Sequence, residues 1–163
     1  MRAKKLLSKL DFNLNLNIYF KEDDTMVSLI IGHKGSGKTK KLIDAVNAAR
    51  EASNGNVICV EKGNKLSNDV KYTVRLVSAE EYKISGFDAY YGFLAGMCAG
   101  DSDITDILCD GTLKIGGEIG DDFLCFFKKV AKLAEATDTK FTFTISADEE
   151  ELPAELFEVA QKI

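Results

Sequence analysis

Three kinds of segment are missing from this sequence, and each absence excludes a class of protein. No apolar run approaches the length needed to span a membrane, and residues 1–25 contain no signal-peptide core. The formal net charge is −5, and no long basic block is present to attract a nucleic acid. We therefore expect a cytoplasmic protein whose partners include neither a membrane nor a nucleic acid.

Cysteine and histidine are too few and too scattered for a metal site. Cys59, Cys98, Cys109 and Cys125 form no C-x-x-C pair, and His33 is the only histidine. A zinc site or a disulfide framework uses closer spacing or histidine partners. Because each cysteine lies in an apolar segment, we expect four buried, reduced thiols.

What the sequence does contain is a strand–loop–helix pattern from Met26 to Asn47, MVSLIIGHKGSGKTKKLIDAVN. Residues 27–31 predict a short buried strand, and the run from about Lys38 predicts an amphipathic helix. The loop between them, GHKGSGKT at residues 32–39, matches G-x-x-x-x-G-K-[ST] at every defined position. The pattern predicts a phosphate-binding loop.

The residue types in this loop fit that chemistry. Glycines allow positive φ and let backbone N–H groups converge on a phosphate, and the helix adds the positive end of its dipole. Lys38 is expected to reach the β- and γ-phosphates, and the Thr39 hydroxyl to bind Mg²⁺. The residues expected to contact the nucleotide are Gly32, His33, Lys34, Gly35, Ser36, Gly37, Lys38, Thr39 and Lys40.

Strand and helix patterns alternate along the rest of the chain. Strands are expected at 27–31, 57–60, 74–77, 103–110 and 140–146, and helices at 38–53, 89–99, 121–137 and 153–162. Gly55, Asp88 and Asp121 are expected to cap helices, and two capping boxes, at 78–81 and 146–149, to open them. This alternation predicts a three-layer α/β domain over residues 26–163, with a mostly parallel five-stranded sheet and helices on both faces.

Residues 1–25 form a separate extension, rich in lysine and asparagine. Lys21-Glu22-Asp23 can be encoded as AAG-GAG-GAT, which contains a ribosome-binding sequence at a suitable spacing before Met26. Our hypothesis is that Met26 is the natural start and that residues 1–25 are translated leader. Mass spectrometry of the protein from its native host tests this, since a full-length N-terminus would contradict it.

Asp110 is the second expected site residue. It ends the apolar strand Ile107-Leu108-Cys109, and ligands of such sheets bind beyond the carboxyl ends of the strands. It looks like a Walker B aspartate, with a catalytic role beside Lys38 and a metal-binding role beside Thr39. The alternative is an ordinary Asp-Gly turn. Asp106, earlier on the strand, is a weaker candidate.

The residues around Asp110 predict slow hydrolysis. Many P-loop ATPases place a glutamate after this aspartate, whereas here the next residue is Gly111. Replacement bases would have to come from Glu61, Glu118, Asp121 or Asp148, and Ser146 occupies the place of a sensor residue or of a helix cap. Arginine is also scarce: Arg2, Arg50 and Arg75 are the only three, and none is an evident arginine finger.

Taken from Met26 onward, the sequence resembles the P-loop NTPase superfamily and, within it, small P-loop proteins of Firmicutes that carry the label twitching-motility ATPase-like. The segments that carry this resemblance are the loop, YYGFLAGMCAGDSDITDILCDGTLKIGG and FTFTISADEEELP. The resemblance implies a P-loop NTPase fold with ATP and Mg²⁺ as cofactors. GHKGSGKTKKLIDA is also similar to thymidine-kinase-like proteins, but no Asp-Glu pair follows Cys109.

Three functions compete on this basis. The first is a nucleotide-binding protein that switches or slowly hydrolyses ATP, with a protein partner or a second copy completing the site. The second is a small-molecule or nucleoside kinase, with its acceptor under residues 86–100 or 111–120. The third is a scaffold with a vestigial loop. The guanine-reading Asn-Lys-x-Asp is incomplete, because Ser67 follows Asn64-Lys65-Leu66, and this favours ATP. Tyr90 and Tyr91 are expected either to stack on a base or to lie in the core.

Overall fold

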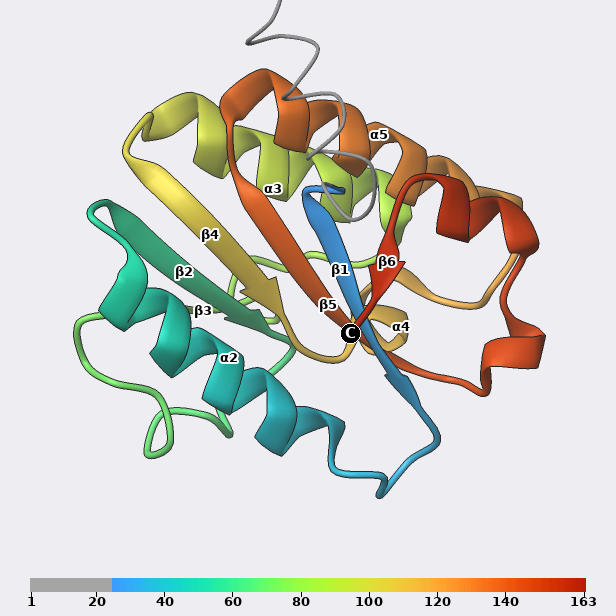
Figure 1. The fold of residues 1–163 in the computed structure, drawn as a ribbon, viewed down its shortest axis with the longest axis horizontal. Coiled ribbons are helices and arrows are strands. Elements are labelled where there is room, and N and C mark those ends of the chain that lie inside the picture. The colour runs from blue at the N-terminus through green and yellow to red at the C-terminus, as the bar shows by residue number, and fades with distance from the viewer. Residues whose placement is uncertain (1–24) are drawn as a thin grey trace, which may run out of the picture.

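The computed structural model describes residues 25–163. The six strands of this part of the chain form a single parallel sheet (Figure 1). The expected extension therefore lies, except for Thr25, outside the described residues. The sheet order is β3-β2-β4-β5-β1-β6. The strands are β1 (Val27–Gly32), β2 (Asn56–Glu61), β3 (Arg75–Ser78), β4 (Ile104–Cys109), β5 (Lys140–Ser146) and β6 (Gln161–Lys162).

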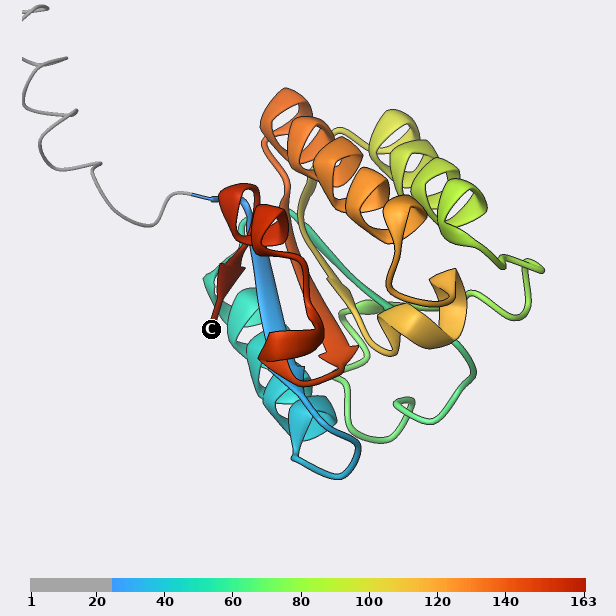
Figure 2. The same ribbon diagram turned by 90° about the vertical axis from the view of Figure 1, so that its right-hand side faces the viewer.

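Helices cover both faces of this sheet. Helix α2 (Lys38–Ala52) packs on one face, and α3 (Phe87–Gly100) and α5 (Asp121–Thr137) lie together on the other (Figures 1 and 2). This confirms the predicted three-layer α/β fold. The predicted number of strands was wrong by one, because β6 adds to the free edge of β1.

The core lies in two layers, one on each side of the sheet. Along β2, Val57 and Cys59 pack under α2, whereas Ile58 and Val60 pack under α3 and α5. This confirms the expectation that an uninterrupted apolar run forms a strand buried on both faces. The larger layer is rich in phenylalanine: α5 buries Phe126 and Phe127 against Phe143 of β5, with Phe127 and Phe143 ring centroids 5.1 Å apart, and Phe123 packs on Phe127.

The end of the chain differs from the predicted helix over 153–162. It forms two short 3₁₀ helices, η1 (Glu149–Glu151) and η2 (Ala154–Glu158), followed by β6. Leu152, Leu156 and Ala160 are buried. This spacing of four residues also suits an α-helix, which explains the error. The capping box is present but shifted, with Asp148 and Glu151 as its two members.

The predicted helix after Ser78 is also absent, and residues 79–83 form turns. Ser78 ends β3, and its hydroxyl donates to the Lys62 carbonyl at 3.1 Å. The N–H groups of Ala79 and Glu80 donate to the carbonyls of Glu61 and Lys62. Because the Ser78 hydroxyl is bonded to the Lys62 carbonyl, it is not available to cap a helix.

The three residues that were predicted to cap helices do not occupy the cap positions. Asp88 and Asp121 lie within the first turns of α3 and α5, where they suit the helix dipole, but glycines precede both helices without a side-chain cap. Gly55 does not cap α2, which ends at Ala52. It is needed because a Cβ there would lie 2.2 Å from the Asp103 carbonyl oxygen.

Three further observations complete the fold. The segment expected as a loop from 111 to 120 contains a short helix, α4 (Thr112–Gly116). Three cysteines are buried as expected, but Cys125 is exposed on α5, so the prediction of four buried thiols was wrong for that residue. Across residues 25–163, no helix has both the length and the apolar character to cross a membrane.

Candidate functional site

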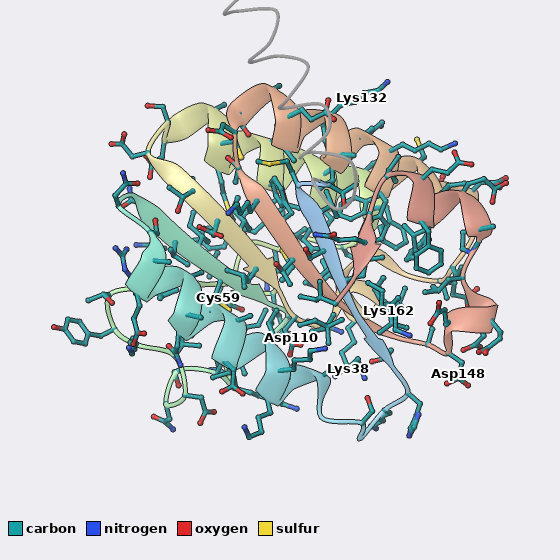
Figure 3. All side chains as sticks on the ribbon, in the orientation of Figure 1. Lys38, Cys59, Asp110, Lys132, Asp148 and Lys162 are labelled. Atoms are coloured by element: carbon teal, nitrogen blue, oxygen red, sulfur yellow. The ribbon has the colours of Figure 1, made fainter. Side chains whose placement is uncertain are left out.

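The candidate site lies at the carboxyl edge of the sheet, where β1 and β4 end. The Gly32–Thr39 loop leaves β1 and leads directly into α2, and Asp110 follows β4. Figure 3 shows Lys38 and Asp110 together at this edge, far from Lys132 on α5. The fold therefore brings the two predicted catalytic residues to one place.

Glycines give the Gly32–Thr39 loop its shape. Gly35 and Gly37 have φ values of +86° and +88°, a region that side chains strongly disfavour. A Cβ on Gly32 would lie 2.4 Å from the Ser36 hydroxyl oxygen, so the loop closes tightly on its own first residue. The backbone conformation thus requires glycine at 35 and 37, whereas at Gly32 a side chain would meet the Ser36 side chain.

Lys38 is the only buried residue of this loop. Its ammonium donates to the His33 carbonyl at 2.8 Å and so bridges the two ends of the loop. Burial lowers the pKa of Lys38, and the positive charge of Lys114 lowers it further, while Asp110 opposes both effects. The Lys38 ammonium is therefore partly desolvated, and within residues 25–163 Asp110 is the carboxylate that favours its charge.

Thr39 and Asp110 meet across the site although they are 71 residues apart in sequence. The Thr39 hydroxyl lies 3.3 and 3.4 Å from the two carboxylate oxygens of Asp110 and donates to them. A hydroxyl and a carboxylate at the start of a helix are oxygen ligands suited to Mg²⁺. These two residues fit the expected metal site.

Thr144 is a site residue that the sequence analysis missed. Its buried hydroxyl donates to Asp110 Oδ1 at 2.8 Å and accepts the Gly111 N–H at 2.9 Å. The pairing of Cys109 with Phe143 in the sheet places Thr144 beside Asp110. A polar residue inside the apolar strand FTFTI was the available signal, but its meaning depends on β5 lying next to β4.

Lys114 on α4 is the second missed residue. Its aliphatic stem lies across Gly111, with Cδ 3.4 Å from the position of a Cβ on that glycine. Gly111 itself has a φ of +68°. The glycine that replaces the expected glutamate thus serves the turn that leads back into α4.

The candidate bases differ in their surroundings. Glu61 is buried, and its carboxylate accepts the N–H groups of Lys65 and Leu66 at 2.9 and 3.2 Å, so it holds its own loop. Asp148 is exposed and lies 3.9 Å from the His33 ring. Glu118, between α4 and α5, and Asp121, at the start of α5, are exposed. Of these four acidic residues, Asp148 is the one that contacts the Gly32–Thr39 loop in the described part of the chain, through His33.

Other candidates lie away from the Thr39–Asp110 pair or in the core. Arg50 donates to the carbonyls of Ser53 and Gly55 at the far end of α2. Asp106 accepts from the neighbouring Thr105 hydroxyl at 2.7 Å. Tyr90 is fully buried and stacks on Phe126, which supports the core interpretation of this tyrosine.

The remaining loop residues are open to solvent. His33, Lys34, Ser36 and Lys40 are exposed, and Lys40 lies 3.2 Å from the Asp44 carboxylate one turn along α2. Ser146 is exposed at the end of β5, where Asp148 rather than Ser146 caps the following turn. These side chains are thus open to solvent around a loop whose one buried side chain is Lys38.

No protein-family model matches this chain, and neither does any curated protein. Its function therefore has to be inferred from the geometry of the Gly32–Thr39 loop, Thr39 and Asp110.

Proposed function

We propose that this protein binds a nucleoside triphosphate, ATP, together with Mg²⁺, and acts as a switch or a slow ATPase that a partner activates. One observation carries the proposal: the Thr39 hydroxyl and the Asp110 carboxylate lie 3.3 Å apart beside a glycine-shaped loop. An isolated motif match can arise by chance, but a chance match does not require a distant carboxylate at the threonine.

Each residue of the site has a role in this proposal. The backbone of Gly35 and Gly37 lets N–H groups face the phosphates without side chains between them. Lys38 exchanges its bond to the His33 carbonyl for phosphate oxygens. Thr39 and Asp110 would hold Mg²⁺, which when bound neutralises charge on the β- and γ-phosphates. Thr144 keeps the Asp110 carboxylate in place.

Slow hydrolysis follows from what surrounds Asp110. Gly111 cannot orient a water molecule, and the buried carboxylate of Glu61 is used by two backbone N–H groups. Arg50 binds backbone carbonyls at the opposite end of its helix. A partner that supplies a base or an arginine would complete the site, as arginine fingers do in other nucleotide hydrolases.

Thermal unfolding with ATP, GTP and ADP, each with and without Mg²⁺, tests this proposal. A ligand at about 100 times its Kd adds roughly 2.7 kcal/mol of stability, which is readily measured. We expect the largest shift with ATP and Mg²⁺. Lys38→Ala should weaken binding roughly 10- to 100-fold, because it removes charged hydrogen bonds to phosphate.

Lys132→Ala is the matched control, since it removes the same charge from an exposed site on α5 (Figure 3). It should bind nucleotide as the wild type does. If the wild type shows no shift with any nucleotide, or if both lysine variants lose binding equally, the proposal is wrong.

A further inference from the structure

Lys114 lies on a segment outside the glycine-rich motif, and its aliphatic stem covers the residue that follows Asp110. The backbone N–H of Lys114 donates to the Gly111 carbonyl at 3.0 Å, and its side chain runs back over Gly111. Its Cβ, Cγ and Cδ lie 3.4 to 3.9 Å from the position that a Cβ on Gly111 would occupy. The side chain thus covers the residue directly after Asp110.

The positive charge of Lys114 is close enough to repel the positive charge of Lys38. It contributes to the lowered pKa of Lys38, although burial contributes more. Within residues 25–163, no carboxylate lies within 4.0 Å of the Lys114 ammonium. Among the described residues, Lys38 in the loop and Lys114 over Gly111 are thus two cations beside the single carboxylate of Asp110. A bound polyanion would relieve this excess of positive charge.

The turn that presents Lys114 is fixed on both sides. The Gly111 N–H donates to Thr144 on β5 at 2.9 Å, and the Gly86 N–H donates to the Ile115 carbonyl at 2.9 Å. Gly116, at the end of α4, packs so closely on the Phe87 ring that a Cβ would lie 2.1 Å from Cε1. Helix α4 is thus held to β5 and to α3, so Lys114 begins from a defined position.

We propose that Lys114 binds the terminal phosphate of the nucleoside triphosphate, an inference that rests on the function proposed above. The Gly32–Thr39 loop and Lys38 reach the site from β1, whereas Lys114 reaches it from the side of β4, next to Asp110. A triphosphate carries more negative charge than a diphosphate, so a further cation beside Asp110 would favour the triphosphate. Lys114 supplies there the cation that the scarce arginines do not.

The test compares how tightly a non-hydrolysable ATP analogue and ADP, both with Mg²⁺, bind to Lys114→Met. Methionine keeps an aliphatic stem over Gly111 and removes the charge. We expect the analogue to bind about tenfold more weakly, because a charged hydrogen bond is lost, and ADP to change less than about twofold. Lys132→Met, which removes an exposed charge on α5, should change neither affinity.

Lys114→Arg keeps the charge and should keep the preference for the triphosphate. Equal losses for both ligands in Lys114→Met, or no loss for either, would overturn the inference while leaving the proposed function intact. An arginine variant that loses the preference as the methionine variant does would also overturn it, because charge would then not be the cause. A wild type that binds neither ligand would instead contradict the proposed function.

Discussion

Asp110 is held by two hydroxyl groups that come from different parts of the chain. Thr39, at the start of α2, is exposed, and Thr144, within β5, is buried. The buried hydroxyl is bonded on both sides, to the carboxylate and to the Gly111 N–H. Thr144 therefore positions Asp110, while Thr39 is free to turn from the carboxylate towards a ligand.

Thr144→Val should destabilise the protein, because valine has a similar shape but leaves the Gly111 N–H without its partner. We expect the free energy of unfolding in urea to fall by about 1–3 kcal/mol. Thr144→Ser should retain most of the stability, since it keeps the hydroxyl. Thr142→Val, at a half-buried position on the same strand, should change stability by less than about 0.5 kcal/mol. Equal losses in the two valine variants would contradict the role of Thr144.

At the scale of elements, local signals predicted the loop and most helices and strands. The glycines and Lys38-Thr39 carry the loop conformation within eight residues, so no distant contact is needed to recognise it. Asp110 was recognisable from the strand that precedes it. Thr144 and Lys114 were not, because their roles depend on which strand lies beside β4 and on where α4 turns.

The errors share a cause, which is competition from distant backbone groups. Residues 161–162 form a strand instead of the predicted helix because they pair with the free edge of β1. The Ile163 N–H then donates to the Leu29 carbonyl of β1 at 2.9 Å. Ser78 does not cap a helix because it pairs with Glu61 of β2 and its hydroxyl donates to the carbonyl of Lys62, the residue after β2. Sheet edges are filled by whichever segment reaches them, and a single sequence does not say which one will.

Two glycines in helices should respond in opposite ways to alanine. Gly96 is exposed on α3 with nothing within 4 Å of a Cβ, so Gly96→Ala should stabilise the protein by about 0.5–1 kcal/mol. Gly116→Ala should destabilise it by about 1–3 kcal/mol, because the buried Phe87 ring must move. Thermal unfolding measures both. Stabilisation by Gly116→Ala would show that α4 does not pack closely on α3.

At the scale of the whole molecule, the cysteines report whether the two core layers are intact. Burial raises the pKa of the Cys109 thiol to about 12, and it also raises the pKa of the Cys59 thiol. Cys98 is buried on the inner face of α3, and Cys125 alone is exposed among the four. The native protein therefore presents one accessible thiol, and the unfolded chain presents four.

At pH 8, a thiol reagent such as Ellman's reagent should react rapidly with one cysteine per chain and with all four in denaturant. Thiolates are the reactive species, so the raised pKa values add to the steric protection of Cys59 and Cys109. Cys125→Ser should remove the rapid reaction. Rapid reaction of a second thiol in the native protein would contradict the packing of the core.

The sheet order has a consequence for how the chain acquires its site during translation. Strand β1, which carries the Gly32–Thr39 loop, is the first of the described strands to be synthesised, yet both its neighbours, β5 and β6, are the last. A nascent chain that has reached only β4 has made the loop and Asp110, but it lacks the strand that lies between them in the sheet. We expect the ribosome-bound protein to be unable to hold the proposed nucleotide until β5 has emerged, so that ligand binding would report when β5 has joined the sheet.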